Sequence, residues 1–261
     1  MTPEAPIAEI ELPSAPPRDP AWTIWDILLI ALVFFLAFYG ATFVGFSAAH
    51  RIPQFADSSR KALIFNPFFL VPVQFGAYLV TFLFTRMLIT LRSQNDFWHA
   101  VKWNPPRMNL VATLAFGGAT LALLVQVASG LLPIPKSLPV EQYFRDAPSA
   151  YMMMAFGVLV APLAEELLFR GLLFPVLARG LGMTAGVALS AFLFALIHQA
   201  QLSHAWAPLL LLFVVGLVLT ITRAVTRSVA ASWIIHVAYN ATLFGFLYVS
   251  SQGFRHLENV K

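Results

Sequence analysis

The sequence contains no cysteine, so disulfide bonds, thiolate nucleophiles and zinc sites built on thiolates are all excluded. Charged residues are also scarce, at 11% of the 261 residues, and only twelve of these residues are Asp or Glu. Hydrophobic residues make up 59% of the chain, and its mean hydropathy is +0.77. Such a composition is not that of a soluble globular domain and indicates a polytopic integral membrane protein.

Basic runs and RNA-binding sequence patterns are missing as well, although the net charge is +4. Lys and Arg are spread through the polar connections, which suits the anionic headgroups of a lipid bilayer. We therefore expect the bilayer as a partner and no nucleic acid. Residues 1–21 hold six prolines and four acids, without a basic segment before an apolar core, which predicts a disordered tail instead of a signal peptide.

Apolar runs divide the rest of the chain into membrane spans. The fold class predicted is therefore all-α: a polytopic transmembrane helical bundle with about seven to eight membrane helices, the eighth hidden in 172–178. We expect one integral-membrane domain at 22–249, with its chemistry in 150–249, and a polar C-terminal tail at 250–261. Lys and Arg are nearly balanced between the two sides, so orientation stays open. The expected spans are 22–46, 67–91, 108–132, a fourth from about 150, a short run at 183–199, 206–222 and 229–249.

The connection that follows the third span is rich in proline and contains the amphipathic segment 140–145. It predicts either a short interfacial helix or a gate over a site.

One cluster of charge interrupts an apolar run: Glu165, Glu166 and Arg170. An ionisable side chain at the middle of a bilayer costs roughly 2.5 to 3.5 kcal/mol on insertion scales, so three together predict a functional site. Glu166 and Arg170 are four residues apart and can pair on a helix, while Glu165 points about 100° away. One acid is therefore expected to be structural and the other free for chemistry. Pro162, just before them, predicts a kink or a new half-helix.

Two other runs contribute polar residues: His198 ends one, and His236 and Asn240 lie four apart on another. A carboxylate, a histidine that shares its proton and a pair of donors are the parts needed to activate water and hold an oxyanion. Each residue alone also has a structural interpretation. Intramembrane His and Asn commonly bond neighbouring helices, and Phe194 alone is typical of packing.

These residues resemble the motifs of the CAAX prenyl endopeptidases of the glutamate-containing intramembrane type and their prokaryotic relatives, the bacteriocin-processing and self-immunity proteins (the CPBP family). The family patterns EExxxR, FxxxH and HxxxN or HxxxD occur here in the family order. The third motif often has Phe four residues before its His, whereas Ser232 stands here. The three matches are Glu165 to Arg170, Phe194 to His198 and His236 to Asn240.

The resemblance implies an intramembrane endopeptidase that cuts a membrane-associated protein or peptide, with a lipidated CAAX-like substrate in its eukaryotic relatives. It implies that Glu165 and His198 activate water, that His236 and Asn240 stabilise the oxyanion, and that Glu166 belongs to the same catalytic set. Arg170 and Phe194 would give structural support. Relatives are often described as metalloproteases, and Glu165, His198 and His236 would be the ligands of one divalent metal such as zinc. No HExxH pair establishes that metal.

Two other classes of function stay open. Glu and His inside a helical bundle also build proton relays, so a proton-coupled transporter is one alternative, although no inverted repeat is visible. A catalytically silent membrane scaffold is the other. The expected location is the cytoplasmic (inner) membrane, and the sequence leaves the oligomeric state open.

Overall fold

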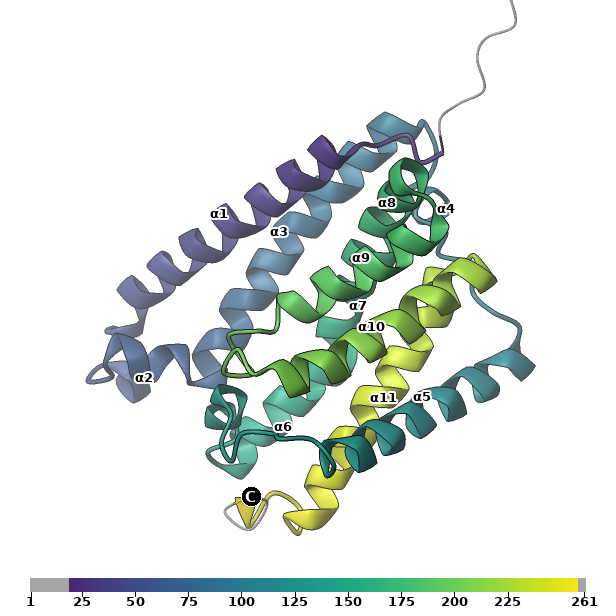
Figure 1. Cartoon of the computed structure of the whole chain (residues 1–261). Coiled ribbons are helices and arrows are strands. Elements are labelled where there is room, and N and C mark those ends of the chain that lie inside the picture. Colours follow the sequence, from purple (N-terminus) through teal and green to yellow (C-terminus); the bar gives the residue numbers. More distant parts are fainter. Residues whose placement is uncertain (1–18, 258–261) are drawn as a thin grey trace, which may run out of the picture.

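The computed structural model describes residues 19–257, and this part of the chain is helical without a strand (Figure 1). The long helices are α1 (Ile24–Ala49), α3 (Pro67–Ser93), α5 (Met108–Ser129), α10 (Trp206–Thr226) and α11 (Val229–Ser250). One span of 35 residues joins α6 (Ala147–Ala155), η3 (Phe156–Val160), α7 (Ala161–Glu166), η4 (Leu167–Leu173) and α8 (Phe174–Leu181). The shorter elements are η1 (Pro53–Phe55), α2 (Arg60–Ile64), α4 (Phe97–Ala100), η2 (Pro139–Tyr143) and α9 (Met183–Leu196).

The predicted fold class is confirmed, because residues 19–257 contain six helices long and apolar enough to cross a membrane, together with the shorter α9. The stretch 172–178 lies inside the continuous span 147–181 and adds no separate crossing. The 14 residues of α9 rise only about 21 Å, less than the roughly 30 Å of a hydrocarbon core. A helix of this length that begins at one face of the hydrocarbon core would end inside it, and His198 follows the end of α9.

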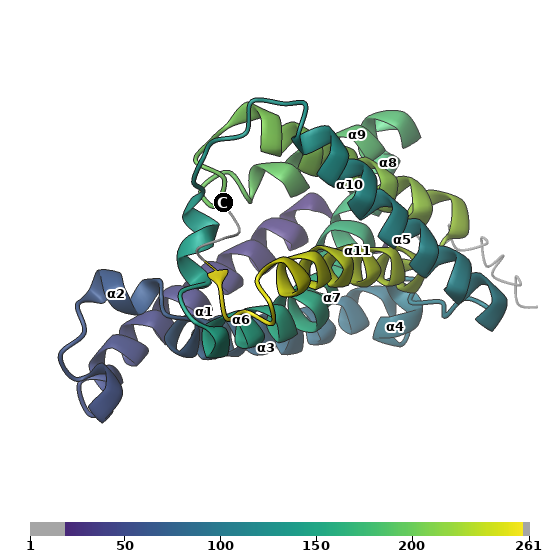
Figure 2. The ribbon, with the colours of Figure 1, turned by 90° about the horizontal axis from the view of Figure 1, so that it is seen from below.

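The spans form a bundle with α1 and α5 at opposite edges (Figures 1 and 2). α1 packs along α3, α5 packs along α11, and α10 lies against both α9 and α11. Large apolar side chains on the outer helices are exposed, among them Phe35 and Phe43 on α1 and Phe116 on α5. These side chains are the surface that lipid would cover.

Small residues let the inner helices approach closely. A Cβ atom added at Gly118 of α5 would collide with the backbone carbonyl of Ile235 in α11. A Cβ added at Gly186 of α9 would lie 2.7 Å from the Cα atom of Ala178 in α8. Helix contacts of this kind are typical inside membranes.

The span 147–181 is wider than an α-helix in two places, η3 and η4, which are π-helical. Each is followed by a proline in the next helix, Pro162 in α7 and Pro175 in α8. A proline ring clashes with the carbonyl four residues earlier and supplies no N–H, and one extra residue in the turn relieves both defects. The predicted kink at Pro162 is therefore a local widening, and it isolates the short α7 between two irregular turns.

Both ends of the described chain pack onto the bundle. Trp22 is buried and its indole N–H donates to the Leu172 carbonyl at 2.9 Å, while Arg179 donates to the Trp22 carbonyl at 3.1 Å. At the other end, residues 251–255 fold back and bury Phe254. Most of the predicted N-terminal tail, residues 1–18, lies outside the described residues, and the domain boundaries at 22 and 249 stay predictions.

Candidate active site

A buried ion pair forms the base of the site. Arg170 Nη1 donates to Glu166 Oε1 at 2.9 Å, and both side chains are fully buried. Arg170 Nη2 also donates to the Gly216 carbonyl at 3.1 Å, which ties this pair to α10. Because an unpaired charge is costly inside a membrane, Glu166 and Arg170 depend on each other.

Glu166 also orients a histidine from α11. The Nδ1 atom of His236 lies 2.9 Å from Glu166 Oε1, and since an ionised carboxylate can only accept, Nδ1 carries the proton. The second oxygen of Glu166, Oε2, is buried and has no hydrogen-bond partner among the described residues. The hydroxyl of Ser232, which stands where relatives often have Phe, donates to the Val229 carbonyl and lies beside the same carboxylate. Rotation of that hydroxyl would give Oε2 a donor.

The neighbouring acid has different surroundings. Glu165 faces the Nε2 atoms of two histidines, at 3.9 Å from His198 and 3.7 Å from His236. Its side chain is 17% exposed and that of His198 is 18% exposed, against 0% for Glu166. The two adjacent acids therefore differ in access: Glu165 can be reached by a small molecule such as water, and Glu166 cannot.

The Nδ1 atom of His198 is fixed by the backbone, because it lies 2.8 Å from the Phe194 carbonyl, which can only accept. In the neutral ring this leaves Nε2 with a lone pair on the side of Glu165. His236, with its proton on Nδ1, presents Nε2 in the same way. Glu165 is thus faced by two imidazole nitrogens that can accept a hydrogen bond or bind a cation.

Phe194 packs between the groups that carry the chemistry. Its ring centroid lies 5.1 Å from that of His198 and 5.8 Å from that of His236, and the guanidinium carbon of Arg170 lies 4.5 Å from it. The side chain is 2% exposed. Phe194 therefore packs against Arg170 and both histidine rings and limits the freedom of all three side chains.

Asn240 lies one turn after His236 and reaches the irregular turn before α7. Its Nδ2 atom donates to the Gly157 carbonyl at 2.7 Å. In a π-helical turn that carbonyl would accept from the residue five positions later, which is Pro162 and has no N–H. Asn240 thus replaces a backbone donor that Pro162 removes. The oxyanion role predicted for Asn240 stays a prediction, since one of its two N–H donors is used here.

Tyr78 on α3 was missed by the sequence analysis. Its phenol is close enough to Glu165 for an electrostatic interaction, accepts from Gln74 Nε2 at 2.9 Å, and its ring stacks on Phe156. A Gln and a Tyr four apart inside an apolar span are a polar pair on one helix face, and that signal was available in the sequence.

The metal predicted from the resemblance has the right kinds of donor here, namely one carboxylate and two imidazole Nε2 atoms. Tetrahedral zinc with ligands at about 2.1 Å would need these atoms about 3.4 Å apart, and the two distances to Glu165 are 3.7 and 3.9 Å. His236 Nδ1 bound to Glu166 and His198 Nδ1 bound to a carbonyl are the supporting bonds that zinc-binding histidines usually make. Within residues 19–257, however, no group of three or more such side chains meets the geometry of a formed metal site.

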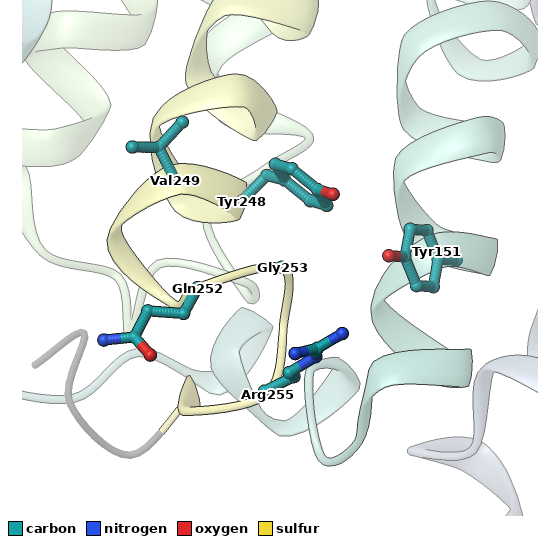
Figure 3. Close-up of a pocket in the computed structure, with 6 residues that line it drawn as sticks. All are labelled: Tyr151, Tyr248, Val249, Gln252, Gly253 and Arg255. Atoms are coloured by element: carbon teal, nitrogen blue, oxygen red, sulfur yellow. The ribbon is translucent and has the colours of Figure 1, made fainter.

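A pocket of about 390 Å³ lies between α6 and the end of α11 (Figure 3). None of the motif residues lines it. It is therefore a separate feature from the cluster around Glu165.

The fold and the cluster together define a class: a polytopic membrane protein with two acids, two histidines and an arginine gathered between its helices. Comparison with known proteins agrees. Residues 147–242 match the model of a family described as type II CAAX prenyl endopeptidase Rce1-like, so the chain carries an Rce1-like domain that holds all the motif residues, and the family resemblance is confirmed. No curated protein and no solved structure matches the chain.

Proposed function

We propose that this protein is an intramembrane endopeptidase that hydrolyses a peptide bond with water activated by Glu165 and His198. The observation that carries the proposal is that the two adjacent acids, Glu165 and Glu166, have different partners and different exposure. Arg170 neutralises Glu166, whereas Glu165 is accessible and faces two Nε2 atoms at 3.7 and 3.9 Å. The Rce1-like domain supports a CAAX-type membrane protease as the broader class.

In this mechanism Glu165 takes a proton from a water molecule that His198 helps to hold. The water oxygen bonds to the carbonyl carbon of the substrate peptide, and the carbonyl oxygen becomes an oxyanion. As the C–N bond breaks, Glu165 passes the proton to the leaving amine nitrogen. The net reaction consumes one water molecule and needs no other reactant.

The oxyanion needs donors. Because His236 already uses its Nδ1 proton on Glu166, its Nε2 donates only when the ring carries a second proton. A protonated His236 would also balance the charges of two carboxylates against the single guanidinium of Arg170. The Tyr78 hydroxyl is a second donor near Glu165, and Asn240 keeps its predicted role through its other N–H.

If a divalent metal belongs to the site, Glu165, His198 and His236 would hold it, and it would supply a Lewis acid and lower the pKa of a bound water. Zinc content measured on purified wild-type protein and on His236→Ala tests this without an activity assay. Equal, substoichiometric zinc in both would remove the metal from the proposal.

We propose a membrane-associated protein or peptide as the substrate, including lipidated CAAX-like ends. The support is that α9 is too short to cross the hydrocarbon core, which favours a position of His198, just after its end, inside the bilayer region. We also propose the cytoplasmic membrane as the location, because outer membranes house barrels and this chain is a helical bundle.

The test is Glu165→Gln, which keeps the shape of the side chain but cannot take a proton. Turnover of a membrane-peptide substrate by purified protein should fall by about 10² to 10⁴, with an unchanged melting temperature. Glu166→Gln is the matched control, since it should lose thermal stability first and turnover second. Full activity in Glu165→Gln would exclude the mechanism and favour the transporter or scaffold.

A further inference from the structure

The chain after α11 forms a fixed hook at residues 251–255. Residues 252–254 all have positive φ, with values of 52°, 78° and 62°, and the N–H of Gly253 donates to the Tyr248 carbonyl at 2.8 Å. Phe254 is buried, and its ring meets the rings of Tyr151 and Tyr248 edge-on at 5.0 and 5.3 Å. These contacts hold the hook against α6 and α11, so the residues that follow the buried ring have a defined position.

The hook forms one side of the open pocket of about 390 Å³ shown in Figure 3. The hydroxyls of Tyr151 and Tyr248 point toward one another across it, and the guanidinium of Arg255 lies close enough to Tyr151 to interact with it electrostatically. One cation and two phenol hydroxyls, which lie close enough to interact with each other, face the same space, and among the described residues none that lines the pocket is acidic. This chemistry accepts an anion with several oxygens. The lining residues are Tyr151, Tyr248, Val249, Gln252, Gly253 and Arg255.

The position of the pocket identifies the source of the anion. It lies where α6 begins and α11 ends, so both spans leave the membrane at this level. Tyr side chains are typical of that boundary. Val249, which lines the pocket, is 75% exposed and would touch acyl chains. A ligand with an anionic head directly above an apolar chain matches both features.

We propose that this pocket binds the phosphate group of an anionic lipid headgroup, with Arg255 as the charge partner and the hydroxyls of Tyr151 and Tyr248 as donors. The site is separate from the peptidase cluster and does not depend on the proposed activity. The bound lipid would fix the hook between the start of α6 and the end of α11 and thereby stabilise the folded protein.

The experiment measures the melting temperature of the full chain in nanodiscs of phosphatidylcholine, with and without phosphatidylglycerol. The wild type should gain about 2 to 4 °C with phosphatidylglycerol. Arg255→Gln should lose most of this gain, and Tyr248→Phe, which keeps the ring beside Phe254, should lose part of it. Arg51→Gln is the matched control, because it removes an exposed charge on the same side of the bundle, outside the pocket, and should keep the gain.

A third arm adds inorganic phosphate to the phosphatidylcholine discs and should give little or no shift. If phosphate alone reproduced the full gain, the lipid assignment would be overturned in favour of a free anion. An equal gain in Arg255→Gln and the wild type would overturn the site itself. So would an equal loss in Arg51→Gln and Arg255→Gln, since that would show a general effect of surface charge.

Discussion

Two acid–arginine pairs in this protein have nearly the same length and very different surroundings. In the N-terminal region, Arg92 at the end of α3 meets Asp26 at the start of α1 at 3.0 Å, and the arginine side chain is 55% exposed. In the motif-bearing region, Arg170 meets Glu166 at 2.9 Å with both side chains fully buried. Asp26 also accepts from the N–H and hydroxyl of Thr23. The first pair joins the start of α1 to the end of α3, and the second lies at the base of the candidate active site, between the helices.

The difference shows how depth changes the role of one interaction. At the boundary, water can solvate Arg92, and the Asp26 carboxylate, although only 4% exposed, keeps its two bonds from Thr23 without the arginine, so the pair contributes less to stability. Inside the bundle, water cannot solvate Glu166 or Arg170, so burying this pair costs desolvation energy. We interpret the pair as one that is kept because it positions neighbouring side chains. Glu166 orients His236 and leaves Glu165 as the accessible acid.

Removing the arginine of each pair should give the largest difference in the free energy of unfolding between the two regions. Arg170→Ala should destabilise the protein by about 3 to 5 kcal/mol, since it leaves the Glu166 carboxylate buried without its charge partner. Arg92→Ala should cost about 1 kcal/mol or less. Unfolding of the two purified variants in the same detergent, followed by circular dichroism, compares them directly.

The double variant Glu166→Leu, Arg170→Met sharpens this result, because it removes both charges and should recover much of the stability lost in Arg170→Ala. We expect the double variant to be inactive, since His236 loses its hydrogen-bond partner Glu166. Equal losses in Arg170→Ala and Arg92→Ala would contradict the assignment of different roles.

The sequence predicted these two regions unequally well. The membrane spans could be predicted because a lipid bilayer requires long apolar runs. The cluster of Glu165, Glu166 and Arg170 could be predicted because charged residues inside such runs are costly. The pairing of Glu166 with Arg170 followed from their i, i+4 spacing. Pro162 predicted a local defect, but whether a helix kinks or widens depends on how its neighbours satisfy the freed carbonyl. That partner, Asn240, comes from another span.

Two other features depended on tertiary contacts that local patterns do not report. Phe254 lies in a segment that was expected to be a polar tail, and it is buried only because the chain turns back onto Tyr151 and Tyr248. The proximity of Tyr78 to Glu165 depends on how α3 packs beside the span 147–181.

Loss of the hydrogen bond from Asn240 to the Gly157 carbonyl should lower the stability of the protein by less than loss of Arg170 does. Asn240→Ala should cost about 1 to 2 kcal/mol, because the Gly157 carbonyl loses its donor. In a Pro162→Ala background the backbone N–H returns, so the same substitution should cost measurably less. A double-mutant cycle on melting curves isolates this coupling. Additive costs would show that Asn240 does not act through the carbonyl that Pro162 frees.

The smallest expected effect concerns Tyr78, a polar residue that α3 contributes near Glu165. Tyr78→Phe keeps the stacking on Phe156 and removes only the hydroxyl, so turnover should fall about tenfold while KM and the melting temperature change little. Gln74→Leu is the matched control, because it removes the donor to Tyr78 but leaves the hydroxyl near Glu165, and it should have a weaker effect on turnover. A fall in stability without a fall in kcat would instead assign Tyr78 to packing, and α3 would then be a scaffold helix like α1.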